Sequence, residues 1–457
     1  MGSGYSEKIV FPILLLLFLS APGKSQCQNP IVPPGIYIAD PSAHVWQDGK
    51  LYIYGSRDES PDYFCSYRYH VLSTPDLETW TLFPDAFASK GEADAVLYSD
   101  DYLYAPDVQY KNGLYYLFYC LANRDATEGI AVSEKPEGPF KGGKILKTGK
   151  FNEIDPCVFM DDDGQGYYIW GQFSAKIARL KPNMMEIDST TIRDEIVTEK
   201  EHRFHEGGYM VKRNGIYYFI YSGLSIKDMP TCISYATSSS PWGPFKYGGV
   251  IINNDGCDPG NWNNHGSLVE FKKKWYVFYH RSTHNSKMMR KACVEPIFFN
   301  SDGSINEVEM TSQGAGPPIS AFQIIEAERA CLLNGHLRVQ AFSDNAEELA
   351  GIYSRDRAVY KYIDFGNGAN QLTLRVKSNG KTGKIRLIPD KPWLSSIASI
   401  DMKAFKDNSG WQEITVKTKT ITGIHALWLV TQGEEGELFS VDWFKFANSD
   451  VELGEIP

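Results

Sequence analysis

Alternating apolar and polar positions recur along the first two thirds of the chain in five stretches of similar form. Each stretch has a polar or acidic head, an alternating apolar run, a turn and a second strand rich in aromatic residues. In one of them Asn214-Gly215 is a strong hairpin signal, because a type I′ turn needs positive φ at both central positions. The five stretches are Tyr37–Tyr54, Tyr104–Tyr119, Ile154–Trp170, Phe204–Tyr221 and Asn264–Tyr279.

The spacing of these stretches predicts the architecture. Their heads follow one another at a period of roughly 50 to 65 residues, which is typical of propellers and repeat arrays. Further strand pairs between the copies give about four strands per repeat and little room for helices. The sequence therefore predicts an all-β fold with a five-bladed β-propeller over residues 29–310. A large β-sandwich with similar hairpins is the alternative.

A second domain is expected after a break in the pattern. Residues 311–321 are rich in Gly and Pro and show no periodicity, which favours a linker. Residues 322–447 are again rich in candidate strands, and their number suits one β-sandwich (jelly-roll) domain. Residues 448–457 are predicted to be a polar tail.

The amino terminus and the charge restrict the class of protein. Residues 1–25 resemble an export signal, because Lys8 precedes the apolar run Ile9–Leu19 and small residues follow it. The run is short for a membrane span, although a buried element of the mature fold is the alternative. We expect a secreted or periplasmic protein with no membrane span. The net charge of −10 gives no reason to expect nucleic acid as a partner. The eight cysteines show neither CxxC pairs nor zinc-like spacing, and their pairing stays open.

Acidic residues stand in three of the five heads. The first strand of each propeller blade lines the central channel, so Asp40, Asp155 and Glu206 are expected to meet at one end of it. Carboxyl groups that are gathered in one enclosed place repel one another, which drives their pKa values apart. Such a set suits general acid and base chemistry near neutral pH. A single Asp-Pro pair is more often a turn residue, but three acids at the same place in successive repeats weaken that alternative.

The head motifs resemble those of glycoside hydrolase family 43. The likeness runs from about Asn29 to Asn300 through YIADPSAHVW, YAPDV, EIDPCVF, HEGGYMVKRNGIYYFIYS and NHGSLVEF. It implies a five-bladed propeller of inverting glycosidases that act on furanosides and xylosides. By resemblance, Asp40 is the general base, Glu206 is the general acid, and Asp155 tunes the pKa of Glu206 and holds its orientation. Inversion needs an ionised and a protonated carboxyl group with room for water between them.

The resemblance also implies residues that bind substrate. Tyr104 stands where a Trp is usual and can form a pocket wall, and Asp107 follows it in the second head. His265 resembles a channel histidine that helps to hold a central Ca²⁺ through waters, or it is a core histidine. Arg281 resembles an arginine that reaches the sugar or the acids, or it is a surface arginine. Two inserts are expected at the pocket rim: Arg57–Tyr69 and Leu224–Thr231.

The second domain resembles carbohydrate-binding module family 6. The motifs are IEAERA, KYIDFG, SGWQEITV and VDWFKF. Tyr353 and Trp411 fall where the family has a pair of sugar-stacking rings, and Ser440 stands where an Asn is usual, so sugar binding and a structural role are both open. Three residues match the ligands of the family's structural Ca²⁺, with solvated surface charges as the alternative: Glu326, Glu328 and Asp442.

Taken together, the sequence predicts a secreted, exo-acting, inverting glycosidase whose partner is an oligo- or polysaccharide. The leading expectation is an α-L-arabinofuranosidase of plant-polysaccharide or arabinogalactan side chains. A β-D-galactofuranosidase and a β-xylosidase are alternatives within the family. A non-catalytic sugar-binding propeller and a calcium-stabilised adhesion scaffold are alternatives outside it. The three acids argue against the sugar-binding propeller, because a lectin does not need an acid, a base and a modulator together. The adhesion scaffold predicts no sugar turnover at all.

Overall fold

A computed structural model describes residues 28–122, 127–149, 153–343, 346–402 and 410–449 of the chain. The predicted export signal and nearly all of the predicted tail lie outside these residues. Within them no helix is long and apolar enough to cross a membrane. Seven described cysteines are buried and form no disulfide with one another. Free, buried cysteines of this kind behave as small apolar core residues.

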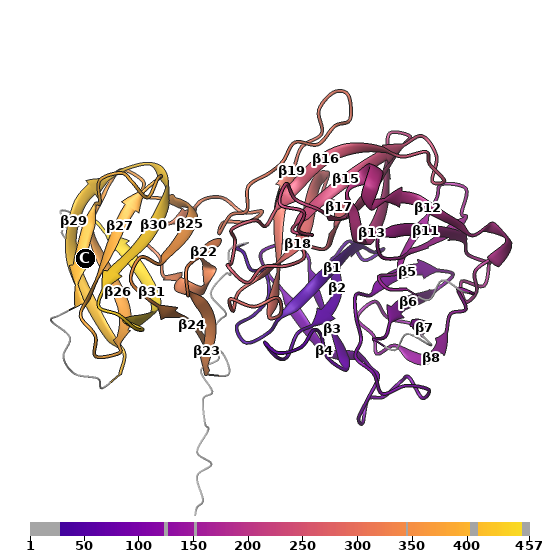
Figure 1. The fold of residues 1–457 in the computed structure, drawn as a ribbon, viewed down its shortest axis with the longest axis horizontal. Coiled ribbons are helices and arrows are strands. Elements are labelled where there is room, and N and C mark those ends of the chain that lie inside the picture. Colours follow the sequence, from indigo (N-terminus) through magenta and orange to yellow (C-terminus); the bar gives the residue numbers. More distant parts are fainter. Residues whose placement is uncertain (1–27, 123–126, 150–152, 344–345, 403–409, 450–457) are drawn as a thin grey trace, which may run out of the picture.

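The first domain consists of five antiparallel sheets, which are the blades of a propeller (Figure 1). Four sheets have four strands and the fifth has three. Blade 1 consists of β1 (Ile38–Val45), β2 (Leu51–Arg57), β3 (Arg68–Thr74) and β4 (Thr81–Ala88). Blade 2 consists of β5 (Asp107–Lys111), β6 (Leu114–Cys120), β7 (Glu128–Ser133) and β8 (Lys141–Ile145). Blade 3 is β9 (Cys157–Met160), β10 (Gly166–Trp170), β11 (Ser174–Arg179), β12 (Arg193–Thr198). Blade 4 consists of β13 (Phe204–Arg213), β14 (Ile216–Gly223), β15 (Cys232–Ser238) and β16 (Lys246–Asn253). Blade 5 consists of β17 (Gly266–Phe271), β18 (Lys274–Ser282) and β19 (Arg290–Ile297).

The first strands of the blades form the inner ring. Each of β1, β5, β9, β13 and β17 contacts the next, and β17 returns to β1. The segment before β1 completes the three-stranded blade, because Ile31 N donates to Ala292 O and Val294 N donates to the side chain of Asn29. Asn214 and Gly215 have φ values of 51° and 79°, as the hairpin prediction requires. The propeller prediction is therefore confirmed.

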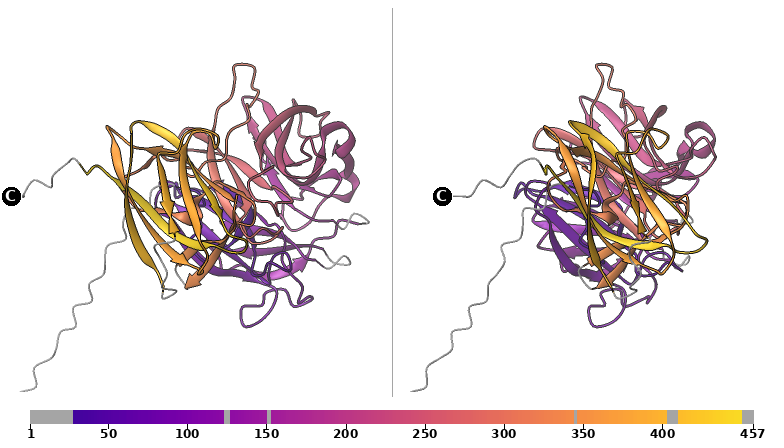
Figure 2. Two further views of the ribbon diagram at one scale, coloured as in Figure 1. Left: turned by 60° about the vertical axis from the view of Figure 1, so that its left-hand side comes forward. Right: turned by 90° about the vertical axis from the view of Figure 1, so that its left-hand side faces the viewer.

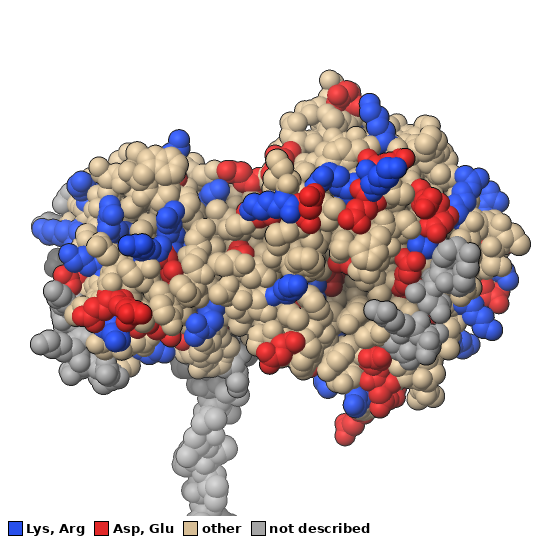
Figure 3. Space-filling model, in the orientation of Figure 1, with Lys and Arg blue, Asp and Glu red and all other residues tan. Residues whose placement is uncertain are grey.

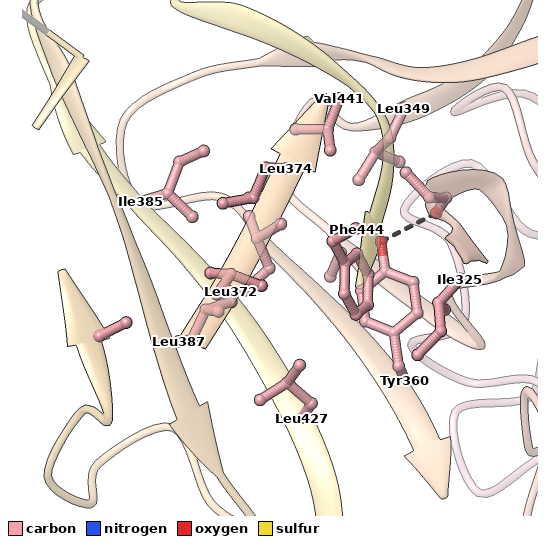
Figure 4. Close-up of a cluster of buried hydrophobic side chains, with 14 of the residues drawn as sticks. Ile325, Leu349, Tyr360, Leu372, Leu374, Ile385, Leu387, Leu427, Val441 and Phe444 are labelled. Carbon is pink, nitrogen blue, oxygen red and sulfur yellow. Dashed lines mark hydrogen bonds between the residues drawn. The ribbon is translucent and has the colours of Figure 1, made fainter. Parts of the chain in front are cut away.

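The second domain is a sandwich of two six-stranded sheets. Its hydrophobic core is built from aliphatic and aromatic side chains (Figure 4). The hydroxyl of one of them, Tyr360, donates a hydrogen bond to Ala327 O. One sheet contains β20 (Ile319–Ser320), β22 (Leu332–Asn334), β25 (Arg357–Asp364), β27 (Gly383–Pro389), β28 (Ala398–Asp401) and β30 (Ile424–Gly433). The other contains β21 (Ile325–Glu326), β23 (Arg338–Ser343), β24 (Ala346–Ile352), β26 (Ala369–Ser378), β29 (Gln412–Ile421) and β31 (Phe439–Ala447). Short helices are η1 (Ser189–Thr191), α1 (Glu199–His202) and η2 (Ala327–Arg329).

The sandwich lies beside the propeller (Figures 1 and 2). A polar, buried contact joins the two domains. The carboxylate of Glu347, in β24, accepts from Lys291 Nζ at 2.6 Å, from Tyr37 Oη at 2.8 Å and from Gly35 N at 3.0 Å. Both charged side chains are almost fully buried. Breaking one partner of a buried ion pair leaves the other charge uncompensated, so this contact holds the sandwich in one position on the propeller.

Candidate active site

A pocket opens where the inner strands of the propeller begin. All five blades contribute to its lining, through Asp40, Tyr104, Asp155, Glu206 and His265. Its cavity volume is about 210 Å³, smaller than the ~300–1,000 Å³ typical of drug-sized ligand sites. Such a pocket suits one terminal sugar rather than a run of sugars.

Local backbone geometry turns the acids into this pocket. Asp40 and Asp155 have φ values of 53° and 63°, in the left-handed region that non-glycine residues seldom adopt. The ladder of β13 is also interrupted on both sides of Glu206. Gly207 follows with φ 66°, and a Cβ there would lie 2.7 Å from the ring of His265. Strained backbone of this kind collects at functional sites, where the surrounding structure holds it in place.

Asp40 is held in its ionised form. Arg290 Nη1 donates to Oδ1 at 3.0 Å and Ser56 Oγ donates to Oδ2 at 2.6 Å. Arg290 is fixed in turn by Asp58, which accepts two guanidinium hydrogen bonds of 2.9 Å. Burial by itself raises the pKa of Asp40, but the charge of Arg290 and the contacts of His280 outweigh it and hold that pKa well below its usual range. Asp40 is therefore a carboxylate at neutral pH.

Asp155 is in the opposite state. Burial raises the pKa of Asp155 well above its usual value, and the charges of Glu206, Asp40 and Glu128 raise it further. Glu128 lies behind it with Oε1 buried and unpartnered among the described residues, and burial raises the pKa of Glu128 to about 8. Asp155 therefore retains its proton more readily than an ordinary aspartic acid. The expected effect of Asp155 on the pKa of Glu206 stays a prediction.

Glu206 is oriented by amide groups. Gln172 Nε2 donates to Oε2 at 2.8 Å and Asn263 Nδ2 donates to Oε1 at 3.3 Å. His205 lies close, with Nε2 at 3.8 Å from Oε2. The Nδ1 atom of His205 is buried and has no hydrogen-bond partner in the described part of the chain.

Several lining residues escaped the sequence analysis, and four of them stand outside the repeated heads: Gln172, Trp262, Asn263 and Arg290. Gln172 comes two residues after the end of β10, and Arg290 opens β19 far from any head motif. The run Asn261-Trp262-Asn263-Asn264 before the fifth head is a signal that could have been used. Three further missed residues flank the heads' own motif positions: Ala105, Ile154 and His205. Phe64 and Cys65 also line the pocket, and both belong to the expected rim insert Arg57–Tyr69.

Arg281 does not reach the pocket, contrary to expectation. It is not among the lining residues, and its Nη1 donates to Ala330 O in the second domain. Neighbouring residues of a strand point to opposite faces, so β18 directs His280 toward Asp40 and Arg281 toward the sandwich. The arginine that serves the acids is Arg290.

Asp107 is also placed differently from the expectation. It is 1 % exposed and does not line the pocket. Its Oδ1 accepts from Ser42 Oγ at 2.5 Å and pairs with His44 Nε2 at 2.6 Å, while Oδ2 accepts from Val158 N at 2.6 Å. With both oxygens engaged, Asp107 ties together the inner strands of blades 1, 2 and 3 beneath the site.

The described residues do not form either of the predicted metal sites as a complete set of ligands. Among them, no three His, Cys, Asp or Glu side chains converge closely enough to hold a metal ion. His265 Nδ1 lies 3.5 Å from Asp40 Oδ1 and 4.0 Å from Asp155 Oδ2. Burial lowers the pKa of His265, so the ring is neutral at pH 7. A Ca²⁺ at the propeller centre stays a prediction.

The acids of the sandwich lie near one another, but one of them already has a cationic partner. The pairing of Glu326 with Trp443 places Glu326 beside Asp442, and Arg375 donates to Asp442. Glu328 Oε2 is buried and has no partner among the described residues, and burial raises the pKa of Glu328 to about 8. These hard oxygen donors suit Ca²⁺ chemically, although they do not form a closed ligand set.

The two aromatic residues of the expected sugar cleft in the sandwich each pack against other side chains. The ring of Tyr353 is tilted against that of His336 at a centroid distance of 4.5 Å. Trp411 packs on Phe342 at 5.2 Å, with the cations of Arg375 and Lys377 over its ring at 5.3 and 5.0 Å. Ser440 is only 2 % exposed. A sugar cleft in the sandwich stays a prediction.

Comparisons with known proteins agree with the two domains. The family model described as "Glycosyl hydrolases family 43" matches residues 27–305, and the model described as "Carbohydrate binding module (family 6)" matches residues 326–448. A xylosidase/arabinosidase of Bacteroides ovatus is 32 % identical over 325 residues, which cover 60 % of this chain and 96 % of the relative.

Two solved structures extend the comparison. An arabinoxylan arabinofuranohydrolase from Bacillus subtilis, in complex with cellotetraose, has a TM-score of 0.53 at 25 % identity and covers 93 % of this chain and 99 % of its own. A β-xylosidase/α-arabinofuranosidase from a compost microbial metagenome, in complex with xylotriose and in a calcium-free form, has a TM-score of 0.53 at 31 % identity. It covers 63 % of this chain and 98 % of its own.

Proposed function

Because this chain belongs to glycosyl hydrolase family 43, we propose that it removes terminal α-L-arabinofuranosyl groups from plant-polysaccharide side chains by inverting hydrolysis. The observation that carries the proposal is the split in protonation among the acids of one small pocket. Asp40 is held ionised, whereas the pKa of Asp155, beside Glu206, is raised well above its usual value. Inverting hydrolysis needs one carboxyl group of each kind on the two faces of the sugar.

The residues divide the chemistry as follows. Asp40 accepts a proton from a water molecule, which attacks the anomeric carbon. Glu206 gives its proton to the glycosidic oxygen, so the bond to the rest of the glycan breaks with the leaving group neutral. Gln172 and Asn263 fix the carboxyl plane of Glu206 during this transfer. Arg290 keeps Asp40 charged until the water attacks.

The names of the related proteins support a pentosyl substrate. The B. subtilis protein is called an arabinoxylan arabinofuranohydrolase, and the likeness to it extends over both domains. The B. ovatus relative is called a xylosidase/arabinosidase, which favours β-xylosidase activity as the second candidate. A neutral glycan also suits the surface, since acidic and basic side chains are interspersed over both domains on the face in Figure 3.

Nitrophenyl glycosides test this proposal directly. The wild-type protein is offered nitrophenyl α-L-arabinofuranoside, β-D-xyloside and β-D-galactofuranoside, together with arabinan, arabinogalactan and arabinoxylan. We expect the fastest release from the arabinofuranoside. Faster release from the xyloside establishes the second candidate, and no release from any of these substrates contradicts a hydrolase of this class. Asp40→Asn serves as the blank, because it lacks the base but keeps the shape of the side chain.

The proposal includes secretion and a calcium ion in the sandwich. Secretion rests on the apolar segment at the amino terminus, and recovery of activity in the culture medium of a host that expresses the full chain tests it. Calcium rests on the oxygen donors Glu326, Glu328 and Asp442, with the buried Glu328 Oε2 as the open donor. We expect CaCl₂ to raise the melting temperature relative to EGTA, and Glu328→Gln to abolish that difference.

A further inference from the structure

A stack of three tyrosines lies beside the catalytic pocket. The ring of Tyr102 stands between those of Tyr63 and Tyr67, at centroid distances of 5.1 and 4.4 Å and interplanar angles of 24° and 30°. Lys90 Nζ lies 4.7 Å from the ring centroid of Tyr67. Tyr63 is 37 % exposed, and the other two rings are half-buried. The aromatic ledge formed by Tyr63, Tyr67 and Tyr102 is not part of the acid cluster.

The backbone fixes the position of this aromatic ledge relative to the pocket. Leu103 N donates to Ser66 O at 2.9 Å, and this bridge runs the two segments antiparallel. Tyr67 and Tyr102 therefore face each other on one side of the bridge, and Cys65 and Tyr104 face each other on the other side. Cys65 and Tyr104 line the pocket. Two residues along a strand span roughly 6.6 Å, so the ledge begins about one sugar ring beyond the pocket wall.

We propose that this aromatic ledge is the leaving-group subsite, on which the glycan chain that carries the cleaved sugar lies. Tyr102 has a ring on each of its faces, so the stack presents the outer face of Tyr63, the most exposed ring, and the hydroxyl-bearing edges of Tyr67 and Tyr102. These groups suit the C–H faces and hydroxyls of a neutral sugar chain. The pocket accommodates one terminal sugar, so the rest of a polymeric substrate has to pass over the rim. The inference rests on the proposed function and adds which residues hold the chain that carries the cleaved sugar.

Contacts with other parts of the propeller hold the rim insert Arg57–Tyr69 in place. Ser286 Oγ, from the loop between β18 and β19, donates to Pro61 O at 3.0 Å. Phe64, between the ledge and the pocket, packs under the guanidinium of Arg290 at 5.1 Å. Both contacts hold the insert that carries Tyr63 and Tyr67 against the pocket.

The test compares a polymer with a small substrate. Tyr102→Ala and Tyr63→Ala are assayed on arabinoxylan and on nitrophenyl α-L-arabinofuranoside, with Tyr102→Phe as the conservative variant. Loss of a stacking contact costs about 1.4 kcal/mol, so kcat/KM on arabinoxylan is expected to fall about tenfold, mainly through KM. The small substrate should change less than twofold, and Tyr102→Phe should restore polymer activity. Trp393→Ala, which removes a ring 75 % exposed on the sandwich, is the matched control and should leave both activities unchanged.

Two results overturn the ledge. Equal losses on both substrates show that the tyrosines only support the fold, and unchanged activity on arabinoxylan shows that the polymer does not lie there. Failure of the proposed function looks different, because wild type then turns over neither substrate. In that case retardation in a gel containing arabinoxylan still decides the matter: wild type retarded more than Tyr102→Ala supports the ledge, and equal migration contradicts it.

Discussion

The propeller centre and the sandwich contain the same kinds of predicted residues, acids and aromatics, but only the propeller centre assembles them into a pocket. There Asp40, Asp155 and Glu206 begin three inner strands of one ring and face a common cavity. In the sandwich Tyr353 packs against His336, and Trp411 packs against Phe342. A repeated blade places equivalent residues at equivalent points, whereas a sandwich site depends on loops that no repeat constrains.

The largest effect is expected from Glu206→Gln. Loss of the general acid should lower kcat/KM on arabinoxylan by about 10²–10⁴-fold, because nothing else protonates the glycosidic oxygen. Substrates with good leaving groups, such as dinitrophenyl arabinofuranoside, should lose much less. Steady-state rates on the two substrates measure this difference. Equal losses on both would assign Glu206 a role other than proton donation.

The sandwich should contribute mainly to stability. Glu347→Gln removes the negative partner of Lys291, whose ammonium group is buried. The free energy of unfolding should fall by about 3–5 kcal/mol, as expected for one broken partner of a buried pair. Urea denaturation measures it. Glu348→Gln is the matched control, because it removes the partner of a lysine that remains accessible to water. Lys377 is half-exposed, and its Nζ lies 3.3 Å from Glu348 Oε2. Similar losses in both variants would contradict a special role for the contact between the domains.

This comparison also shows how far the sequence could lead. The alternation and the Asn-Gly and Asp-Gly turns contained enough local information for the blades, and the repeat then placed Asp40, Asp155 and Glu206 together. Arg290 could not be found in this way, because it comes from an outer position of the fifth blade and meets Asp40 only in three dimensions. Arg281 was one residue out of phase on its strand, and strand phase cannot be told in a strand that is buried on both faces.

The pH dependence of kcat/KM tests whether Arg290, rather than Arg281, is the arginine that acts on Asp40. Arg290 lowers the pKa of Asp40, while burial raises it. Arg290→Gln should therefore raise the pKa of Asp40 and move the acid limb of the kcat/KM profile to higher pH, by about one unit or more for each 1.4 kcal/mol of lost interaction. Arg281→Gln should leave that limb in place. The opposite pattern would restore the sequence-based assignment.

The smallest effect is expected from Trp411→Ala. Phe342, Arg375 and Lys377 already surround the ring, so little of it is available for a sugar. Retention of the protein on arabinoxylan should change less than about twofold, which corresponds to a change in binding free energy below RT. Affinity electrophoresis measures it, with Tyr353→Ala beside it. A loss of tenfold or more in both variants would show that the sandwich has a sugar site that forms upon binding.

The central claim is that Asp40 and Glu206 act on opposite faces of one sugar. The most direct test follows the first-formed sugar by proton NMR during rapid hydrolysis of nitrophenyl α-L-arabinofuranoside, or of the nitrophenyl β-D-xyloside if that proves the better substrate. The account predicts that the anomer opposite to that of the substrate appears first and then mutarotates, and that Asp40→Asn produces almost no sugar. First appearance of the same anomer as in the substrate would contradict the account, because it requires a covalent intermediate in place of a water activated by Asp40.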